Sequence, residues 1–84
     1  MAQPGKIATQ GNRQLIFDTK KSPRWFRITN TGANVMGVTY TDEVGSANLS
    51  IVIKPNNSMD FFALRIDIRD DSGNGVSGIY EGLP

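Results

Sequence analysis

The segment DFFALRIDIRD, residues 60–70, places a large apolar side chain at every second position and restricts the fold more than any other feature. Its alternating apolar residues are Phe62, Leu64, Ile66 and Ile68. In a β-strand such residues share one face, whereas in a helix they would be spread around the axis. The segment therefore predicts one strand with these four residues facing the core, and not the helix that Ser58 could cap.

Period two recurs in shorter segments, which are separated by loops containing Gly, Asn, Asp or Pro. In RWFRITN, Phe26 and Ile28 share one face, and Trp25 and Arg27 share the other. The other candidate strands are QLIFD (14–18), VMGVTY (35–40), ANLSIVIK (47–54) and GVSGIYE (75–81). About six strands, without a convincing helix, predict an all-β fold. We expect a small antiparallel β-sandwich or barrel, Ig-like or jelly-roll-like.

The length of 84 residues fits one domain with a small core. Because the chain contains no Cys, disulfides cannot stabilise it, and association with other chains would compensate. The net charge is +1, which is smaller than the excess usual in nucleic-acid-binding domains. No apolar run approaches the length of about 20 residues that crosses a bilayer, so we expect no membrane partner.

The N-terminal residues 1–13 contain Pro4, Gly5 and Gly11, and only Ile7 is a sizeable apolar residue after Met1. This composition predicts an extended N-terminal arm that contacts neighbouring subunits, followed by a single β-sandwich domain over 14–84. The start MAQPGKIATQ lacks the apolar region of a signal peptide. We therefore expect a chain that is not secreted by a signal peptide and that is cytoplasmic before assembly.

The segment DDSGNGVSGIYE, residues 70–81, nearly matches the calcium-binding loop of an EF-hand, with Asp70 first and Glu81 twelfth. An EF-hand needs a helix on each side of its loop, but a predicted strand precedes Asp70 and only GLP follows Glu81. The sequence favours a β-hairpin built on Asx turns and glycines. A different calcium loop using Asp67, Asp70 and Asp71 stays open, as does recognition of a partner by the loop. We assign no metal and no cofactor.

The absence of His and Cys excludes Ser-His-Asp and Cys-His nucleophile systems and ordinary zinc sites. No segment combines the Gly-Lys-Ser/Thr ending of a phosphate-binding loop with the start of a helix. We therefore expect a protein that is not an enzyme and assign no catalytic residue.

The segment KKSPRWFR, residues 20–27, surrounds two aromatic residues with four basic ones, a pattern also found on surfaces that bind single-stranded nucleic acids. The low net charge favours a charged loop that enters a strand. Trp25 points away from the Phe26 face and suits a subunit contact, the edge of the core or a sugar site. Phe61 lies on the opposite strand face from Phe62, so whether it contacts another subunit, the edge of the core or a sugar is open in the same way. The candidate interface residues are Ile7, Trp25, Arg27 and Phe61.

The motifs WFRITNTG, IVIKPNNSMDFF and VSGIYE follow one another over residues 24–81. In this order the chain resembles small β-sandwich virion proteins of tailed bacteriophages, of the head-decoration or head-fibre-base type. The resemblance implies a virion location and a structural role through contacts with its own copies or with other virion proteins. It carries over no functional residue.

Two further functions stay open. Because similar motifs occur in carbohydrate-binding and adhesin modules, a small carbohydrate- or ligand-binding module using Trp25 and Tyr40 is the first alternative. A single-strand nucleic-acid binder is the second.

Overall fold

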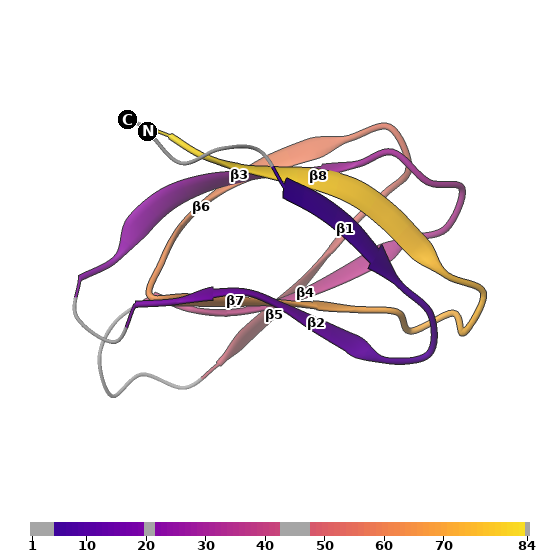
Figure 1. Cartoon of the computed structure of the whole chain (residues 1–84), viewed down its shortest axis with the longest axis horizontal. Helices are drawn as coiled ribbons and strands as arrows, with labels where there is room; N and C mark the ends of the chain where they lie inside the picture. Colours follow the sequence, from indigo (N-terminus) through magenta and orange to yellow (C-terminus); the bar gives the residue numbers. More distant parts are fainter. Residues whose placement is uncertain (1–4, 20–21, 43–47, 84) are drawn as a thin grey trace.

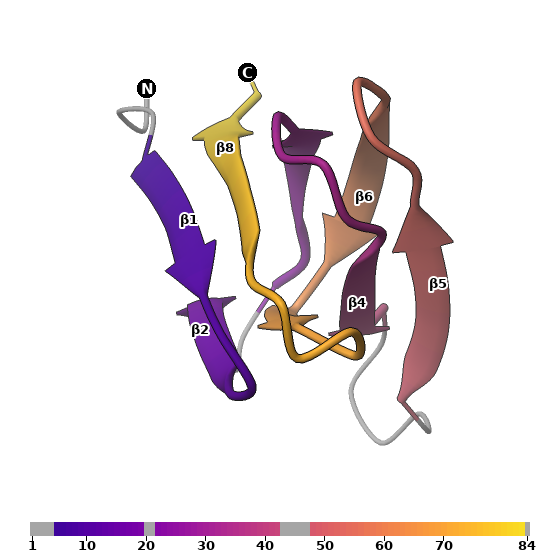
Figure 2. The same ribbon diagram turned by 90° about the vertical axis from the view of Figure 1, so that its right-hand side faces the viewer.

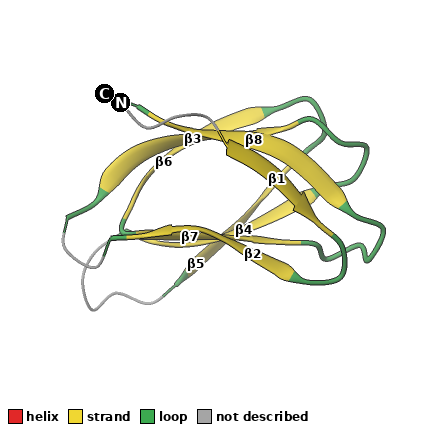
Figure 3. Cartoon of the chain, in the orientation of Figure 1, coloured by secondary structure: helices red, strands yellow, loops and turns green. Residues whose placement is uncertain are grey.

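The computed structural model describes residues 5–19, 22–42 and 48–83. These residues form eight strands and no helix (Figure 3). The strands are β1 Gly5–Thr9, β2 Arg13–Asp18, β3 Arg24–Asn30, β4 Met36–Thr41, β5 Leu49–Ile53, β6 Ser58–Ala63, β7 Arg65–Arg69 and β8 Val76–Gly82. The all-β prediction is confirmed, whereas the expected number of about six strands is wrong.

The strands form two four-stranded sheets in which all neighbours are antiparallel. Sheet A has the strand order β1-β8-β3-β6, and sheet B has the order β2-β7-β4-β5. The two sheets face each other, and the core lies between them (Figure 1). Of the seven connections between the eight described strands, six pass from one sheet to the other, and the connection from β4 to β5 stays within sheet B.

Alternation along the strands produces the core, as the sequence predicted for most segments. Inward-facing residues from both sheets form one buried cluster: Ile7, Phe26, Ile28, Met36, Val38, Ile53, Phe61, Ala63, Ile66, Ile68 and Val76. Trp25 and Arg27 lie on the outer face of β3, as predicted. At the end of the sheets, Asn30 is fully buried and its amide is hydrogen-bonded to three backbone groups.

The long strand predicted over residues 60–70 is wrong, because the chain turns at Leu64 and passes from sheet A to sheet B. Phe61 and Ala63 face the core before this corner, and Ile66 and Ile68 face it afterwards. The inward positions therefore change from odd to even numbers, and Phe62 is 45% exposed. Both backbone polar groups of Leu64 at this corner are hydrogen-bonded. Leu64 N–H donates to Thr41 O at 2.7 Å, and Leu64 O accepts from Thr19 N–H at 2.9 Å.

The predicted N-terminal arm over 1–13 needs correction, because its residues Gly5–Thr9 form β1, an edge strand of sheet A. β1 pairs with β8, and Ile7 inserts into the core with an exposed fraction of 1%. One apolar residue is enough to attach this short edge strand to the core, because its neighbours Lys6 and Ala8 point outward and stay exposed. The domain therefore begins before residue 14, and residues 1–4 lie outside the described part.

The hairpin predicted for residues 70–81 is also wrong. β7 belongs to sheet B and β8 to sheet A, so the DDSGNG loop connects two sheets instead of two paired strands. The Asx turns and glycines were recognised correctly, but turn chemistry does not determine whether the strands on either side pair.

Candidate interaction surface

The outer face of sheet A carries a pair of exposed aromatic rings. Trp25 on β3 lies directly opposite Phe62 on β6, and their ring centroids are 5.2 Å apart with an angle of 39° between the planes. The two residues are 47% and 45% exposed. Cross-strand aromatic pairs stabilise a sheet, but here about half of each large apolar residue still contacts solvent.

An ion pair lies two residues further along the same strands. Arg27 donates from Nε to Asp60 Oδ1 at 2.8 Å and from Nη2 to Asp60 Oδ2 at 3.2 Å. The hydrogen bond from Arg27 lowers the pKa of Asp60, and the same bond raises the pKa of Arg27. Glu81 on β8 is the register partner of Arg27 and adds a second negative charge beside the guanidinium. An exposed pair of this kind adds little stability, but its geometry fixes the direction of both side chains.

We call this surface the Trp25 face and define it by Trp25, Arg27, Asp60, Phe62, Ile79 and Glu81. Ile79 is exposed, and the register places it beside Thr29, whose hydroxyl bonds that of Ser58 at 2.9 Å. Apolar groups and fixed charges thus alternate across one face built on three neighbouring strands.

The structure separates the residues that the sequence proposed for contacts. Trp25 and Arg27 lie on the Trp25 face, whereas Ile7 and Phe61 are buried in the core of the same chain. Tyr40, the proposed sugar-binding companion of Trp25, packs edge-on against Phe61 with ring centroids 5.1 Å apart. Trp25 and Tyr40 therefore do not form one sugar-binding platform.

Phe62 and Asp60 belong to the Trp25 face but were missed as site residues. Phe62 was assigned to the core because the alternation was continued through Leu64. The signal that could have revealed it is the pairing of WFR with DFF, which aligns an aromatic pair and an Arg–Asp pair in one antiparallel register.

The loop after β7 is organised around the Asp70 carboxylate. Its Oδ1 accepts from Ser72 N–H, Ser72 O–H and Gly73 N–H, and its Oδ2 accepts from Gly11 N–H and Gly75 N–H. Gly11 and Gly75 have φ of 67° and 99°, a conformation that favours glycine. These hydrogen bonds, first that from the Ser72 hydroxyl and then that from Gly11, lower the pKa of Asp70 from 3.8 to about 2.

This arrangement suits an anion, here the carboxylate itself, rather than a bound cation, because hydrogen-bond donors surround both oxygens. Asp67 and Asp71 pair with Arg65 and Arg69 at 3.2 and 3.4 Å, respectively. Over the described residues, no group of three or more His, Cys, Asp or Glu is placed to hold a metal ion. The near match to a calcium-binding loop is therefore explained by internal turn chemistry.

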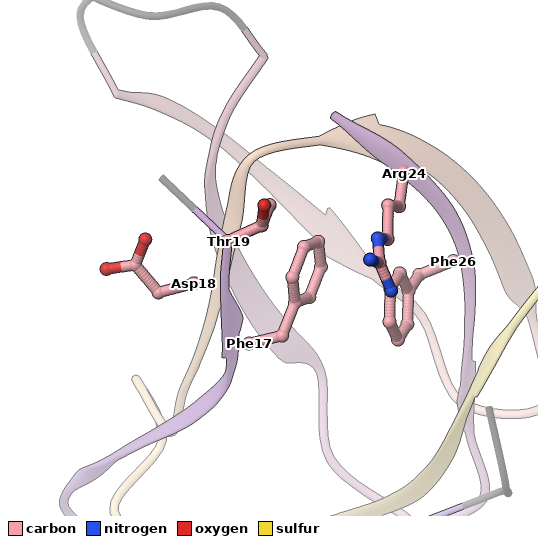
Figure 4. A pocket seen from close by; sticks show the side chains of 5 residues that line it. All are labelled: Phe17, Asp18, Thr19, Arg24 and Phe26. Atoms are coloured by element: carbon pink, nitrogen blue, oxygen red, sulfur yellow. The ribbon is translucent and has the colours of Figure 1, made fainter. Parts of the chain in front are cut away.

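A pocket of about 450 Å³ lies where β2 ends and β3 begins (Figure 4). The Phe17 and Phe26 rings stack within it, with centroids 4.1 Å apart and an angle of 14° between the planes. Arg24 lies beside Phe26, whereas the Asp18 carboxylate points away from both rings. Polar groups do not converge here as they do in a small-molecule site, so we assign the pocket no ligand.

Comparison with family models, curated proteins and solved structures gives no match for this chain. Among residues 5–19, 22–42 and 48–83, no helix is long and apolar enough to cross a membrane.

Proposed function

We propose that this chain is a non-enzymatic assembly protein whose two sheets form a rigid β-sandwich that binds another protein subunit through the Trp25 face. One observation carries the proposal: the half-exposed Trp25 and Phe62 rings contact each other beside the fixed Arg27–Asp60 pair. Aromatic residues and Arg are enriched where protein interfaces bury their central residues.

The composition of the face favours a protein partner over the two alternatives. The tilt of 39° between Trp25 and Phe62 prevents the rings from forming one flat platform for a sugar ring. Arg27 is paired with Asp60 and lies beside Glu81, so its charge is compensated and attracts phosphate weakly. A protein subunit can bury the rings and meet the Arg and carboxylate groups with complementary charges.

The kind of assembly remains a prediction from the sequence resemblance. We propose a component of a virion surface, as in the head-decoration or head-fibre-base proteins, whose partners are other copies or neighbouring virion subunits. Burial of the Trp25 face against such a neighbour would supply apolar area that a small domain without disulfides cannot bury alone.

The sole Trp of the chain allows a direct test. We expect Trp emission to shift to shorter wavelength, and acrylamide quenching to decrease, as protein concentration rises from micromolar to millimolar. Phe62→Ala should weaken this self-association at least tenfold, as loss of an interface anchor worth about 1.4 kcal/mol or more would. Leu15→Ala is the matched control, since Leu15 is 54% exposed, compared with 45% for Phe62, but lies on sheet B.

The same fluorescence distinguishes the alternatives. Unchanged Trp emission over the whole concentration range, together with quenching by an oligosaccharide, would favour a carbohydrate-binding module. Quenching by a single-stranded oligonucleotide that weakens steeply with salt would favour a nucleic-acid binder. Either result would contradict the assembly proposal.

A further inference from the structure

Strand β5 forms one outer edge of sheet B, and no strand of the described chain pairs with its free side. Figure 2 shows β5 at the right-hand margin of the sheet, beyond β4. The free side of any edge strand presents unpaired backbone N–H and C=O groups, so it can accept a strand from another chain. The four edge strands of the two described sheets, β1, β6, β2 and β5, differ in how well they are protected against such pairing.

The edges formed by β1 and β2 are both protected. Gln14 accepts from Ala8 N–H with Oε1 at 2.9 Å and donates from Nε2 to Lys6 O at 3.0 Å. Its amide thus occupies backbone groups on the free side of β1. β2 has a break in register between Leu15 and Phe17, and such a bulge disrupts regular pairing at an edge.

The edge formed by β6 carries a charge in the middle of the strand, because Asp60 lies there and pairs with Arg27. β5 has none of these features: the stretch Leu49–Ile53 contains no charge, no Pro and no break in register. Its outward Val52 is 50% exposed, and Leu49 is 42% exposed. β5 is therefore the edge best suited to accept another strand.

We propose that β5 pairs antiparallel with β5 of a second copy of this chain, about a two-fold axis at Ile51. In this register Ser50 of one copy lies opposite Val52 of the other, and Leu49 lies opposite Ile53. Lys54, the nearest charge, then faces Asn48 and not a second Lys54. The pairing thus joins two uncharged edges without opposing like charges.

Self-pairing fits β5 better than pairing with an unlike strand, because one two-fold contact covers both unprotected edges at once and leaves a closed dimer. The contact is short, since β5 has five residues. Stable interfaces bury about 1,200–2,000 Å² in total. A contact between two five-residue strands buries less than this, so the dimer should be weak and reversible. It joins two B sheets into one continuous sheet and leaves the Trp25 face free on sheet A.

The absence of Cys makes a register test possible. Ser50→Cys and Val52→Cys are prepared as separate proteins, both at exposed positions. Directly opposed residues have Cα atoms about 4.5–5.5 Å apart, within the range of a disulfide. Identical cysteines would be offset by two residues and lie farther apart than the limit of about 7 Å. We expect rapid cross-linking in the mixture and little in either protein alone.

Charge variants give an independent test by sedimentation. Ser50→Lys with Val52→Lys places Lys opposite Lys twice and should weaken the dimer at least tenfold. Ser50→Lys with Val52→Glu places Lys opposite Glu twice and should restore it, although it changes the same two residues. This restoration distinguishes a broken contact from a damaged fold.

Three results would overturn the proposal: a wild-type chain that stays monomeric at millimolar concentration, a Lys/Lys variant that dimerises like wild type, or a single cysteine variant that cross-links as fast as the mixture. Trp emission keeps this test separate from that of the proposed function. A β5 dimer forms without changing the emission of Trp25, whereas contact through the Trp25 face changes it.

Discussion

The carboxylate of Asp70 accepts a hydrogen bond at 2.9 Å from the backbone N–H of Gly11, 59 residues earlier in the chain. Gly11 lies in the β1–β2 connection and Asp70 in the β7–β8 connection, and both connections pass between the two sheets. One buried carboxylate therefore joins the loops at one end of the two sheets. The candidate calcium loop is a structural element of the fold.

The first prediction concerns the removal of this carboxylate. Asp70→Asn should lower the melting temperature, because an amide has one acceptor oxygen in place of two and brings an NH2 group against backbone donors. Asp71→Asn is the control, since Asp71 is exposed and pairs with Arg69 at 3.4 Å. Differential scanning calorimetry should show that Asp70→Asn melts at a lower temperature than Asp71→Asn. Equal melting temperatures would contradict the central role of Asp70.

The second prediction concerns pH. The pKa of Asp70 is lowered in the folded state from 3.8 to about 2, so folding favours the ionised form. The resulting stability is fully present above the unfolded pKa and is lost as the pH falls through the folded pKa. Denaturant unfolding between about pH 5 and pH 2 should therefore show stability falling with acidification, and less steeply in Asp70→Asn. Parallel profiles in the two proteins would contradict this assignment.

The third prediction concerns calcium. Because N–H and O–H donors occupy both Asp70 oxygens, millimolar calcium should leave the melting temperature unchanged. A ligand at one hundred times its dissociation constant adds about 2.7 kcal/mol, which shifts the melting of a domain this size by about 10 °C or more. Thermal melts with calcium and with chelator measure this. A calcium-specific rise of that size would show that the loop binds metal.

The sequence predicted those parts of the fold that depend on alternation within one strand. Phe26 and Ile28 are buried, and Trp25 and Arg27 are outward, because local period two decides between faces. It failed at Leu64, where a buried corner continues the apolar pattern while the chain changes sheets. It also failed at Ile7, because the pairing of β1 with β8 depends on residues more than 60 positions away and leaves little local signal.

Local sequence patterns were also insufficient for the candidate site, because part of it depends on strand pairing. Trp25 and Arg27 were found because they lie out of phase with core residues in one segment. Phe62 and Asp60 join them only through the β3–β6 register, which no local pattern contains. The hydrogen bond from Gly11 to Asp70 was likewise hidden, since Gly11 is 59 residues away in the sequence.

The fourth prediction tests close packing in sheet A. A Cβ at Gly78 would collide with the Thr29 carbonyl oxygen and lie 2.9 Å from Met36 Cε. Gly78→Ala should therefore destabilise the domain by about 1–3 kcal/mol, a typical cost of overpacking. Ser77→Ala, at the exposed neighbouring position on β8, is the control. Urea unfolding measures both, and a Gly78→Ala protein as stable as wild type would contradict the close approach of Gly78 to the Thr29 carbonyl oxygen.

The fifth prediction concerns Asn30, which is fully buried between the turns at one end of the sheets. Its Nδ2 donates to Asn34 O and Ile53 O, both at 2.9 Å, and its Oδ1 accepts from Gly32 N–H at 3.0 Å. Asn30→Ala would remove the partner of one buried backbone group, Ile53 O, and of two partly buried ones, Asn34 O and Gly32 N–H. Leaving a buried group without its partner costs about 1–3 kcal/mol. We therefore expect a loss of at least about 2 kcal/mol and a melting temperature lower by about 8 °C or more.

Asn12→Ala is the matched control for Asn30→Ala, since Asn12 is exposed and its amide makes a long bond of 3.4 Å to Gln10 O. Thermal and urea unfolding should separate the two variants clearly. Since Asn30 links the β3–β4 turn to the end of β5, its loss should also increase hydrogen exchange at the Gly32 amide before global unfolding. If Gly32 exchanged at the wild-type rate while stability fell, the cost would arise from the cavity alone and not from the lost hydrogen bonds.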